Sequence, residues 1–125
     1  TLPPEWKVYF TLWIQLIAAR AGEPPAEEHT ELLRRLGGGS NWWGKLASFG
    51  AGELDYAGLM SVASSLGEET EAIYYEGSRL FIAGDRKAAS DQFQRVLDTK
   101  MVSFFEYEMA RKLLLQQERA GAPNP

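Results

Sequence analysis

Apolar residues recur with helical spacing in several separate stretches of the chain. The first stretch follows the i, i+3, i+4, i+7, i+8 pattern of one helix face, formed by Trp6, Tyr9, Phe10, Trp13, Ile14 and Ile17. Pro3 and Pro4 suit the start of such a helix, because the N–H that proline lacks would be unpaired there anyway. The pattern predicts a helix from about residue 6 to Gly22, with this stripe packed into the core.

Six further helices are predicted, separated by glycine and proline. They cover about residues 26–36, 42–49, 53–66, 68–82, 86–98 and 103–119. Gly67 is expected to end the fourth helix of the chain, and Ser103 with Glu106 has the spacing of a capping box at the start of the last one. Convincing alternation of apolar and polar residues is absent, so the sequence predicts an all-α protein of about seven helices.

Composition narrows the class of protein. A chain of 125 residues has the length of one domain, and 45% hydrophobic with 24% charged residues is typical of a folded globular protein. The net charge is -4, and the 13 basic residues are scattered, which argues against a nucleic-acid interface. There is no cysteine, which excludes disulfides, thiolate metal sites and cysteine nucleophiles.

The longest apolar stretch, Val8–Ala21, is interrupted by Thr11 and Gln15 and is shorter than the roughly 20 residues that a membrane-spanning helix needs. It is therefore predicted to be a core helix, with no transmembrane segment in the chain. The chain begins at Thr1 without a signal-like segment, and we expect that residues upstream of Thr1 were cleaved or left out.

The segment from Thr70 to Leu97 resembles a tetratricopeptide repeat. The small and aromatic positions of the repeat are filled by Gly77, Gly84, Asp85, Ala89, Phe93 and Val96. The resemblance implies a right-handed superhelix of antiparallel helix pairs, in which Gly84 makes the turn and Asp85 caps the second helix. It implies one domain over residues 1–119, with its best repeat at 70–103, a degenerate repeat at about 39–69 and a capping helix at 103–119. A flexible tail is expected at 120–125.

In tetratricopeptide proteins the first helix of each pair lines a concave wall that binds protein or peptide ligands. In the phase set by Gly77, this resemblance implies a binding wall formed by Glu71, Tyr74, Ser78, Phe81, Phe105, Glu108 and Lys112. The alternative is that Phe81 and Phe105 are buried against neighbouring helices. Trp42 and Trp43 are about 100° apart on a helix, so one is expected in the core and the other at an edge or a contact surface.

Several elements in order also resemble the C-terminal half of the bacterial NlpI-type tetratricopeptide lipoproteins. They are YFTLWIQL from Tyr9, the Trp42-Trp43 pair, FGAGELDYAGLM at 49–60, the helix pair at 70–97 and FFEYEMARKLL at 104–114. The resemblance implies a periplasmic or envelope-associated adaptor that dimerises and brings cell-wall hydrolases to a protease, and it leaves a cytoplasmic location open. The chain departs from the family in having no lipid-bearing cysteine, in Glu76 where leucine is preferred, and in Met101 where proline closes the repeat.

Patterns that would indicate catalysis or cofactor binding are incomplete. Residues 39–45 have the glycine and lysine spacing of a phosphate-binding loop, but Leu46 stands where Ser or Thr would hold magnesium. His29 is the sole histidine and has no second histidine for a usual metal site. The acidic residues Glu68, Glu69 and Glu71 fall in the first turn of a predicted helix, where the helix dipole favours negative charge. We therefore expect no catalytic residues, no metal and no cofactor.

These observations lead to one functional hypothesis and two alternatives. The chain is expected to be a non-catalytic adaptor that binds a protein or peptide, possible partners being a cell-wall hydrolase or a protease. The first alternative is a structural or homo-oligomerisation module without a peptide ligand, which an exposed Trp42 or Trp43 would favour. The second is a small helical enzyme, which would need a cleft that gathers acidic side chains around His29.

Overall fold

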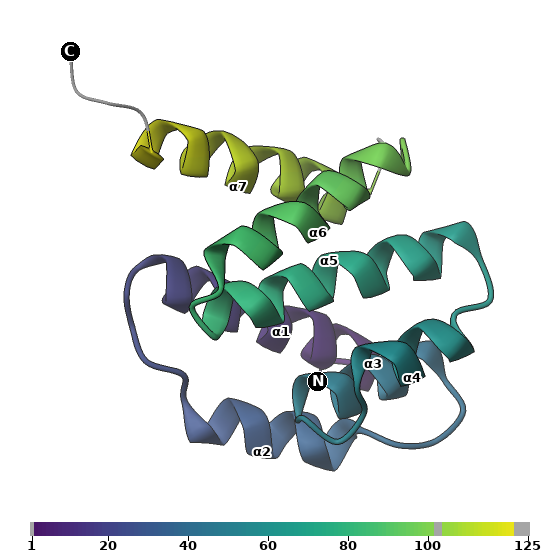
Figure 1. Cartoon of the computed structure of the whole chain (residues 1–125). Coiled ribbons are helices and arrows are strands. Elements are labelled where there is room, and N and C mark those ends of the chain that lie inside the picture. Colours follow the sequence, from purple (N-terminus) through teal and green to yellow (C-terminus); the bar gives the residue numbers. More distant parts are fainter. Residues whose placement is uncertain (1, 102–103, 122–125) are drawn as a thin grey trace.

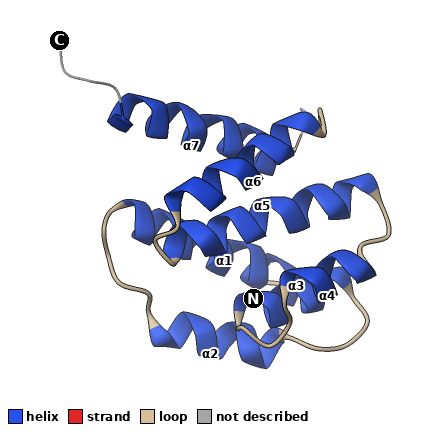
Figure 2. Ribbon diagram, in the orientation of Figure 1, coloured by secondary structure: helices blue, strands red, loops and turns tan. Residues whose placement is uncertain are grey.

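A computed structural model describes residues 2–101 and 104–121 of the chain. Within these residues the chain forms seven helices and no strand, as Figures 1 and 2 show, so the predicted all-α class is confirmed. The helices are α1 (Pro4–Arg20), α2 (Glu27–Leu36), α3 (Trp42–Gly50), α4 (Tyr56–Val62), α5 (Leu66–Ile82), α6 (Arg86–Asp98) and α7 (Phe105–Gly121).

Three of the longer helices run in the same direction. Figure 1 shows that α1, α5 and α7 share a direction, while α6 runs the opposite way and packs against both α5 and α7. Two hydrogen bonds from α1 to α5, Tyr9 to Glu71 and Trp13 to Tyr75, join residues the same 62 positions apart, as parallel helices require. The short helices α2 and α3 pack against α1 on its other flank.

The helix pair α5–α6 forms around a close approach of its two backbones. A methyl group on Gly77 would lie only 2.7 Å from Cε1 of Phe93, so glycine lets the helices come together. Gly84 makes the turn with φ of +92°, which glycine adopts without strain. The Asp85 side chain caps α6 by accepting a hydrogen bond from the Ala88 N–H at 3.1 Å. The sequence predicted these bounds of α6 and both turn residues correctly.

The buried face of α1 differs from the predicted one. Val8, Leu12 and Leu16 point into the core, whereas much of the aromatic and isoleucine stripe lies at the surface. Both sets of residues recur with helical spacing, because α1 is apolar on most of its circumference. Periodicity alone therefore did not determine which face packs inward.

The boundary between α4 and α5 also differs from the prediction. The fourth helix covers only Tyr56–Val62, and Gly67 lies in the first turn of α5 instead of ending α4. The reason is capping: the Asp55 side chain accepts from the Gly58 N–H at 2.8 Å, and the Ser65 side chain accepts from the Glu68 N–H at 3.1 Å. Helix α7 extends to Gly121, into the predicted tail at 120–125, and Ser103 and residues 122–125 lie outside the described residues.

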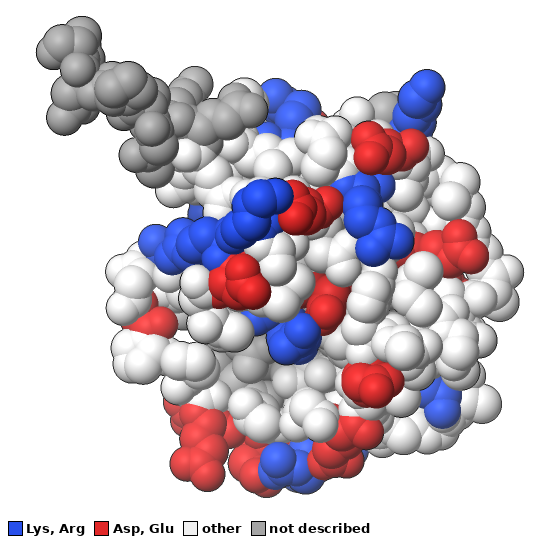
Figure 3. Space-filling view, in the orientation of Figure 1, with Lys and Arg blue, Asp and Glu red and all other residues white. Residues whose placement is uncertain are grey.

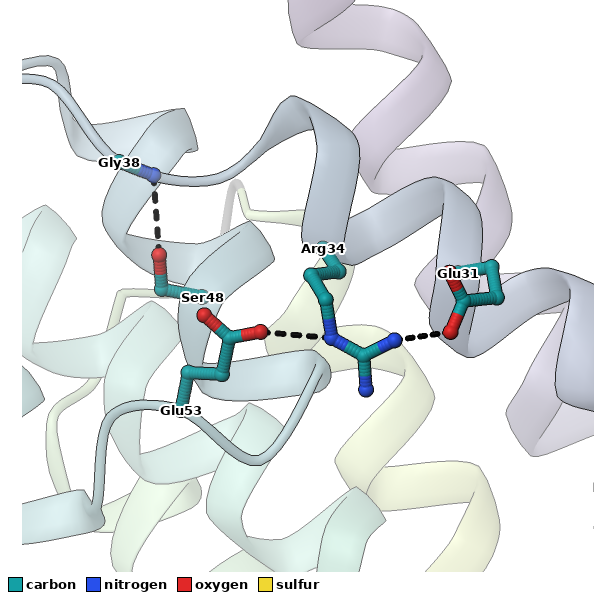
Figure 4. Close-up of polar contacts among 5 residues, drawn as sticks. All are labelled: Glu31, Arg34, Gly38, Ser48 and Glu53. Atoms are coloured by element: carbon teal, nitrogen blue, oxygen red, sulfur yellow. Dashed lines mark hydrogen bonds and ion pairs between the residues drawn. The ribbon is translucent and has the colours of Figure 1, made fainter.

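Exposed polar contacts join α2 to the segments that follow it. Figure 4 shows the Arg34 guanidinium between Glu31 and Glu53, with 2.7 Å between Nε and the Glu53 carboxylate, and the Gly38 N–H donating to Ser48 Oγ at 2.9 Å. Solvent screens pairs this exposed, so they position the α2–α3 loop more than they stabilise the fold. Acidic and basic side chains are mixed over the face seen in Figure 3. None of the helices in the described part of the chain has the length and apolar character to cross a bilayer.

Candidate functional site

One side of α1 presents large apolar side chains to solvent. Trp6 is 47% exposed, Phe10 40%, Ile14 49% and Ile17 57%. Because residues three and four apart are neighbours on a helix surface, the four side chains form a continuous stripe, which we call the outer α1 face. A continuous apolar stripe on a folded domain marks a contact surface far more often than scattered apolar residues do.

Beside the outer α1 face, α1 and α7 are separated by a space that has a solvent-open hollow near each end, and we call this space the α1–α7 groove. The described backbones of these two helices do not come into contact, and side chains bridge the space between them. The Trp13 and Phe105 rings contact each other at a tilt, with 4.5 Å between their centroids, and the Arg20 guanidinium donates to Gln116 Oε1, at 3.1 Å from Nε.

At one end the groove widens into a hollow of about 300 Å³ that is open to solvent. We call it the aromatic-carboxylate pocket, because aromatic rings and carboxylates make up its whole lining. The lining residues are Glu5, Trp6, Tyr9, Trp13, Glu71, Phe104, Phe105 and Glu106.

Glu71 is held in this pocket by neutral hydrogen-bond donors. The Tyr9 hydroxyl and the Trp42 indole N–H, the latter at 3.1 Å, both donate to Glu71 Oε1. Burial raises the pKa of Glu71 to about 7, and the negative charges of Glu106 and Glu68 act in the same direction against the two hydrogen bonds. The same burial and the Glu71 carboxylate raise the pKa of Tyr9, so Tyr9 stays protonated and remains a donor.

Glu106 is the more deeply buried of the two central carboxylates, with only 6% of its surface exposed. The Tyr75 hydroxyl donates to Glu106 Oε2 at 3.0 Å, and the Trp13 indole N–H donates to the same hydroxyl oxygen at 2.7 Å. Burial raises the pKa of Glu106 above its usual value, although hydrogen bonds to its carboxylate act in the opposite direction. Among the described residues, neither Glu106 nor Glu71 has a lysine or arginine nitrogen within 4 Å.

The structure places the predicted concave wall in two different environments. Tyr74, at 1% exposure, Ser78 and Phe81 are buried, and Tyr74 packs against Phe93 of α6. The expectation that these three line an open wall is therefore wrong for this structure. The physical reason is that α6 covers one side of α5 while α1 packs against another, which leaves these side chains little access to solvent.

The predicted wall residues on α7 and at the start of α5 are more accessible than those further along α5. Phe105, Glu108 and Lys112 lie at the surface of α7, with Phe105 45% exposed, and the half-buried Glu71 lines the aromatic-carboxylate pocket. The sequence places Glu71 both on the predicted wall and in the first turn of its helix, and neither prediction includes its hydrogen bonds with Tyr9 and Trp42. A contact role for Phe105, Glu108 and Lys112 stays a prediction.

The two adjacent tryptophans share the same intermediate burial. Trp42 and Trp43 both pack partly against the core, so neither is the fully buried residue that one of them was expected to be. Trp42 makes its polar contact inward, to Glu71. The residues predicted to pack the repeat lie where that role requires, since Ala89 and Phe93 are buried and Gly77 is in the tight α5–α6 crossing.

Little in the sequence indicates the aromatic-carboxylate pocket. Tyr9 and Trp13 were assigned to the core stripe, and Glu106 was assigned only to a capping box. A carboxylate inside a protein looks like any other glutamate in the sequence, because its burial depends on how α1, α5 and α7 meet. Glu106 and Glu71 lie 35 positions apart in the chain, and no short motif joins them.

The other features weighed from the sequence do not form a comparable site. Within the described residues there is no group of three or more His, Asp or Glu side chains that could hold a metal ion. His29 lines a larger hollow of about 430 Å³ beside the α1–α2 loop, together with Phe81 and Arg86, whose guanidinium lies 3.9 Å from the Phe81 ring centre. Among the described residues, no side-chain hydrogen bond joins two of the residues that line that hollow, whereas such a bond links Tyr9 to Glu71 in the aromatic-carboxylate pocket, so we take the latter as the candidate site.

Comparison of the chain with protein-family models, with curated proteins and with solved structures found no match in any of the three. The resemblance to tetratricopeptide repeats and to the NlpI-type lipoproteins, with the periplasmic location that it implies, therefore stays a prediction. The function has to be argued from the site itself.

Proposed function

We propose that this chain is a non-catalytic interaction module that binds a partner protein through the outer α1 face and the adjoining α1–α7 groove. The single observation that supports this most strongly is the continuous exposure of four large apolar side chains on one helix. The unfavourable hydration of that surface is relieved when a partner covers it.

The helix arrangement supports a tetratricopeptide-like architecture for this module. In α5, α6 and α7, two helices of like direction pack against an antiparallel helix between them, and a glycine lies at the first crossing. This is the order of a repeat followed by the first helix of the next one. The proposed binding surface differs from the one first expected, because α1 covers part of α5 and presents its own outer side instead.

The electrostatics of the pocket favour binding over catalysis. Acid-base catalysis by two carboxyl groups depends on environments that push their pKa values apart, so that one donates while the other accepts a proton. Here burial raises the pKa of both Glu71 and Glu106. The described residues that line the pocket also include no histidine, lysine or arginine that could relay a proton or stabilise charge developing in a reaction.

The test removes the apolar surface without disturbing the core. The wild-type chain and a Phe10→Ser/Ile17→Ser variant are immobilised and exposed to extract from the source cells. Each protein retained by the wild type is then purified, and its dissociation constant is measured against both forms. Because both side chains are largely solvent-exposed, the variant is expected to keep its helical signal and its unfolding midpoint.

A matched control carries the same kind of change elsewhere. Val62→Ser/Leu66→Ser also removes two exposed apolar side chains, but from the α4–α5 junction. We expect at least a tenfold loss of partner affinity for the α1 variant and less than a twofold loss for the control. Equal partner affinity of all three forms would refute the proposal. The proposal would also fail if the wild-type chain retained no other protein and formed only a dimer with itself in sedimentation experiments.

A further inference from the structure

We propose that the aromatic-carboxylate pocket receives the cationic end of a lysine or arginine side chain carried by the partner protein. This inference rests on the proposed function, because it names the side chain with which the partner anchors itself beside the outer α1 face. It assigns a ligand chemistry to a pocket that apolar contact alone does not explain.

The pocket gathers carboxyl groups without a cation to pair with them. Glu106 is buried and Glu71 is half-buried, and among the described residues no basic nitrogen lies within 4 Å of either carboxylate. The lining contains three carboxylates and no lysine, arginine or histidine. Buried carboxylates in folded proteins are normally paired, because an isolated charge in a poorly hydrated site is costly. A cation from outside the chain would supply the missing partner.

The aromatic wall of the pocket also suits a cation. Five rings line the pocket, and the Trp13 and Phe105 rings pack against each other at its edge. The face of an aromatic ring attracts an ammonium or guanidinium group, and tryptophan does so most strongly. The rings also suit the apolar stem of lysine and arginine, which buries its methylene groups while its charged end reaches a carboxylate.

The lining distinguishes an organic cation from a metal ion. Calcium and magnesium take six or more oxygen ligands, and the described residues contain no group of three or more side chains placed to hold a metal. Aromatic rings supply no such ligands. Rings together with a few carboxylates are instead the surroundings that a guanidinium or an alkylammonium group prefers.

The position of the pocket identifies the kind of partner. Trp6 belongs both to the pocket lining and to the outer α1 face, so a segment that covers the apolar stripe reaches the pocket at the same time. The acidic rim complements a segment in which a basic residue stands among apolar ones.

The pocket is tested with small molecules that carry only the end of the side chain. Butylguanidinium and butylammonium chloride are titrated into the full chain, and the indole N–H signals of Trp6 and Trp13 are followed by NMR. Butanol, which has the same alkyl stem without a charge, and potassium chloride are the matched controls. We expect saturable shifts with the two organic cations and only small linear changes with the controls.

Variants then locate the effect. Glu71→Gln/Glu106→Gln keeps the side-chain shapes and removes both charges, and we expect it to weaken cation binding at least tenfold. Glu69→Gln changes the net charge from the same helix, but its side chain is exposed outside the pocket, and we expect less than a twofold effect. Absence of saturable shifts with either cation, equal shifts with butanol, or equal weakening by both variants would overturn the proposal.

A last arm separates a partner side chain from a free cation. A partner obtained in the capture experiment is measured against the wild type and the double glutamine variant, before and after acetylation of its lysines and modification of its arginines. We expect partner affinity to fall at least tenfold for the double glutamine variant. We expect a loss of the same size for the wild type once the basic residues of the partner are modified. If small cations bind but partner affinity is unchanged, the ligand is a free organic cation and this proposal fails. The proposal for the outer α1 face is tested separately, by the Phe10→Ser/Ile17→Ser variant.

Discussion

Glu71→Gln should make the chain more stable at neutral and alkaline pH. In the folded protein, burial raises the pKa of Glu71 from its usual 4.5 to about 7. The folded state therefore holds a proton that the unfolded chain releases, and the contribution of Glu71 to stability is full below pH 4.5 and is lost as the pH rises to about 7. Glutamine has no proton to lose, and its amide oxygen can still accept from Tyr9 and Trp42.

The size of the effect follows from the pKa. A rise from 4.5 to about 7 corresponds to about 3 kcal/mol. Because Glu71 keeps some contact with solvent, screening reduces this value, and we expect about 1 to 2 kcal/mol. Burial raises the pKa of Glu106 as well, so the wild type retains some pH dependence of the same sign from that residue.

The assay is urea unfolding followed by circular dichroism at 222 nm, at half-unit steps between pH 5 and pH 8. The quantity to compare is the difference in unfolding free energy between Glu71→Gln and the wild type. We expect this difference to increase in favour of the variant by about 1 to 2 kcal/mol across the range. Glu69→Gln is the control and should give a flat difference. A flat difference for Glu71→Gln, or a variant that loses stability at pH 8, would refute the burial argument.

Three further changes test the packing. Gly77→Ala should cost about 1 to 3 kcal/mol, because its new methyl group would lie 2.7 Å from a Phe93 ring atom, and an unchanged urea midpoint would count against the close crossing. Tyr74→Ala should cost about 3 to 5 kcal/mol, since Tyr74 is buried in the core, and a wild-type thermal midpoint would contradict that placement. Ala89→Arg should unfold the α5–α6 pair, because a charge cannot enter this buried crossing without a partner, and a soluble variant with full helical signal would show the opposite.

The parts of the fold that the sequence predicted well are governed by local chemistry. Gly84 and Asp85 set the turn and the cap of α6 within a few residues, so the bounds of that helix follow from the sequence. The α4–α5 boundary was missed although its signals are equally local. Ser65 competes with Gly67 as a boundary signal there, and the serine cap determines where α5 begins.

The parts that were missed depend on contacts between distant segments. Helix α1 has two apolar faces, and only the packing of α1 against α3 and α5 determines that Leu12 and Leu16 are buried while Phe10 and Ile17 are exposed. The same packing turns Tyr9 and Trp13 toward α5 and completes the carboxylate pocket. A pattern within one helix cannot specify such a choice, because it depends on which neighbour covers which face.

This dependence also explains the displacement of the proposed binding surface. The repeat phase predicted that residues on α5 would face a ligand, and α1 packs against part of that helix instead. The surface available for binding therefore moves outward by one helix layer, to the outer α1 face. The predicted α7 residues keep their exposure because α1 and α7 remain separated by the groove.

The most direct test of the central claim is site-specific photo-crosslinking to a partner obtained in the capture experiment. Phe10 is replaced by p-benzoylphenylalanine, which preserves an aromatic side chain on the outer α1 face, and the same group is placed at the exposed Asp91 of α6 as a control. The account predicts an efficient crosslink to the partner from position 10 and little or none from position 91. A crosslink from position 91 alone, or one from position 10 only to a second copy of this chain, would contradict it.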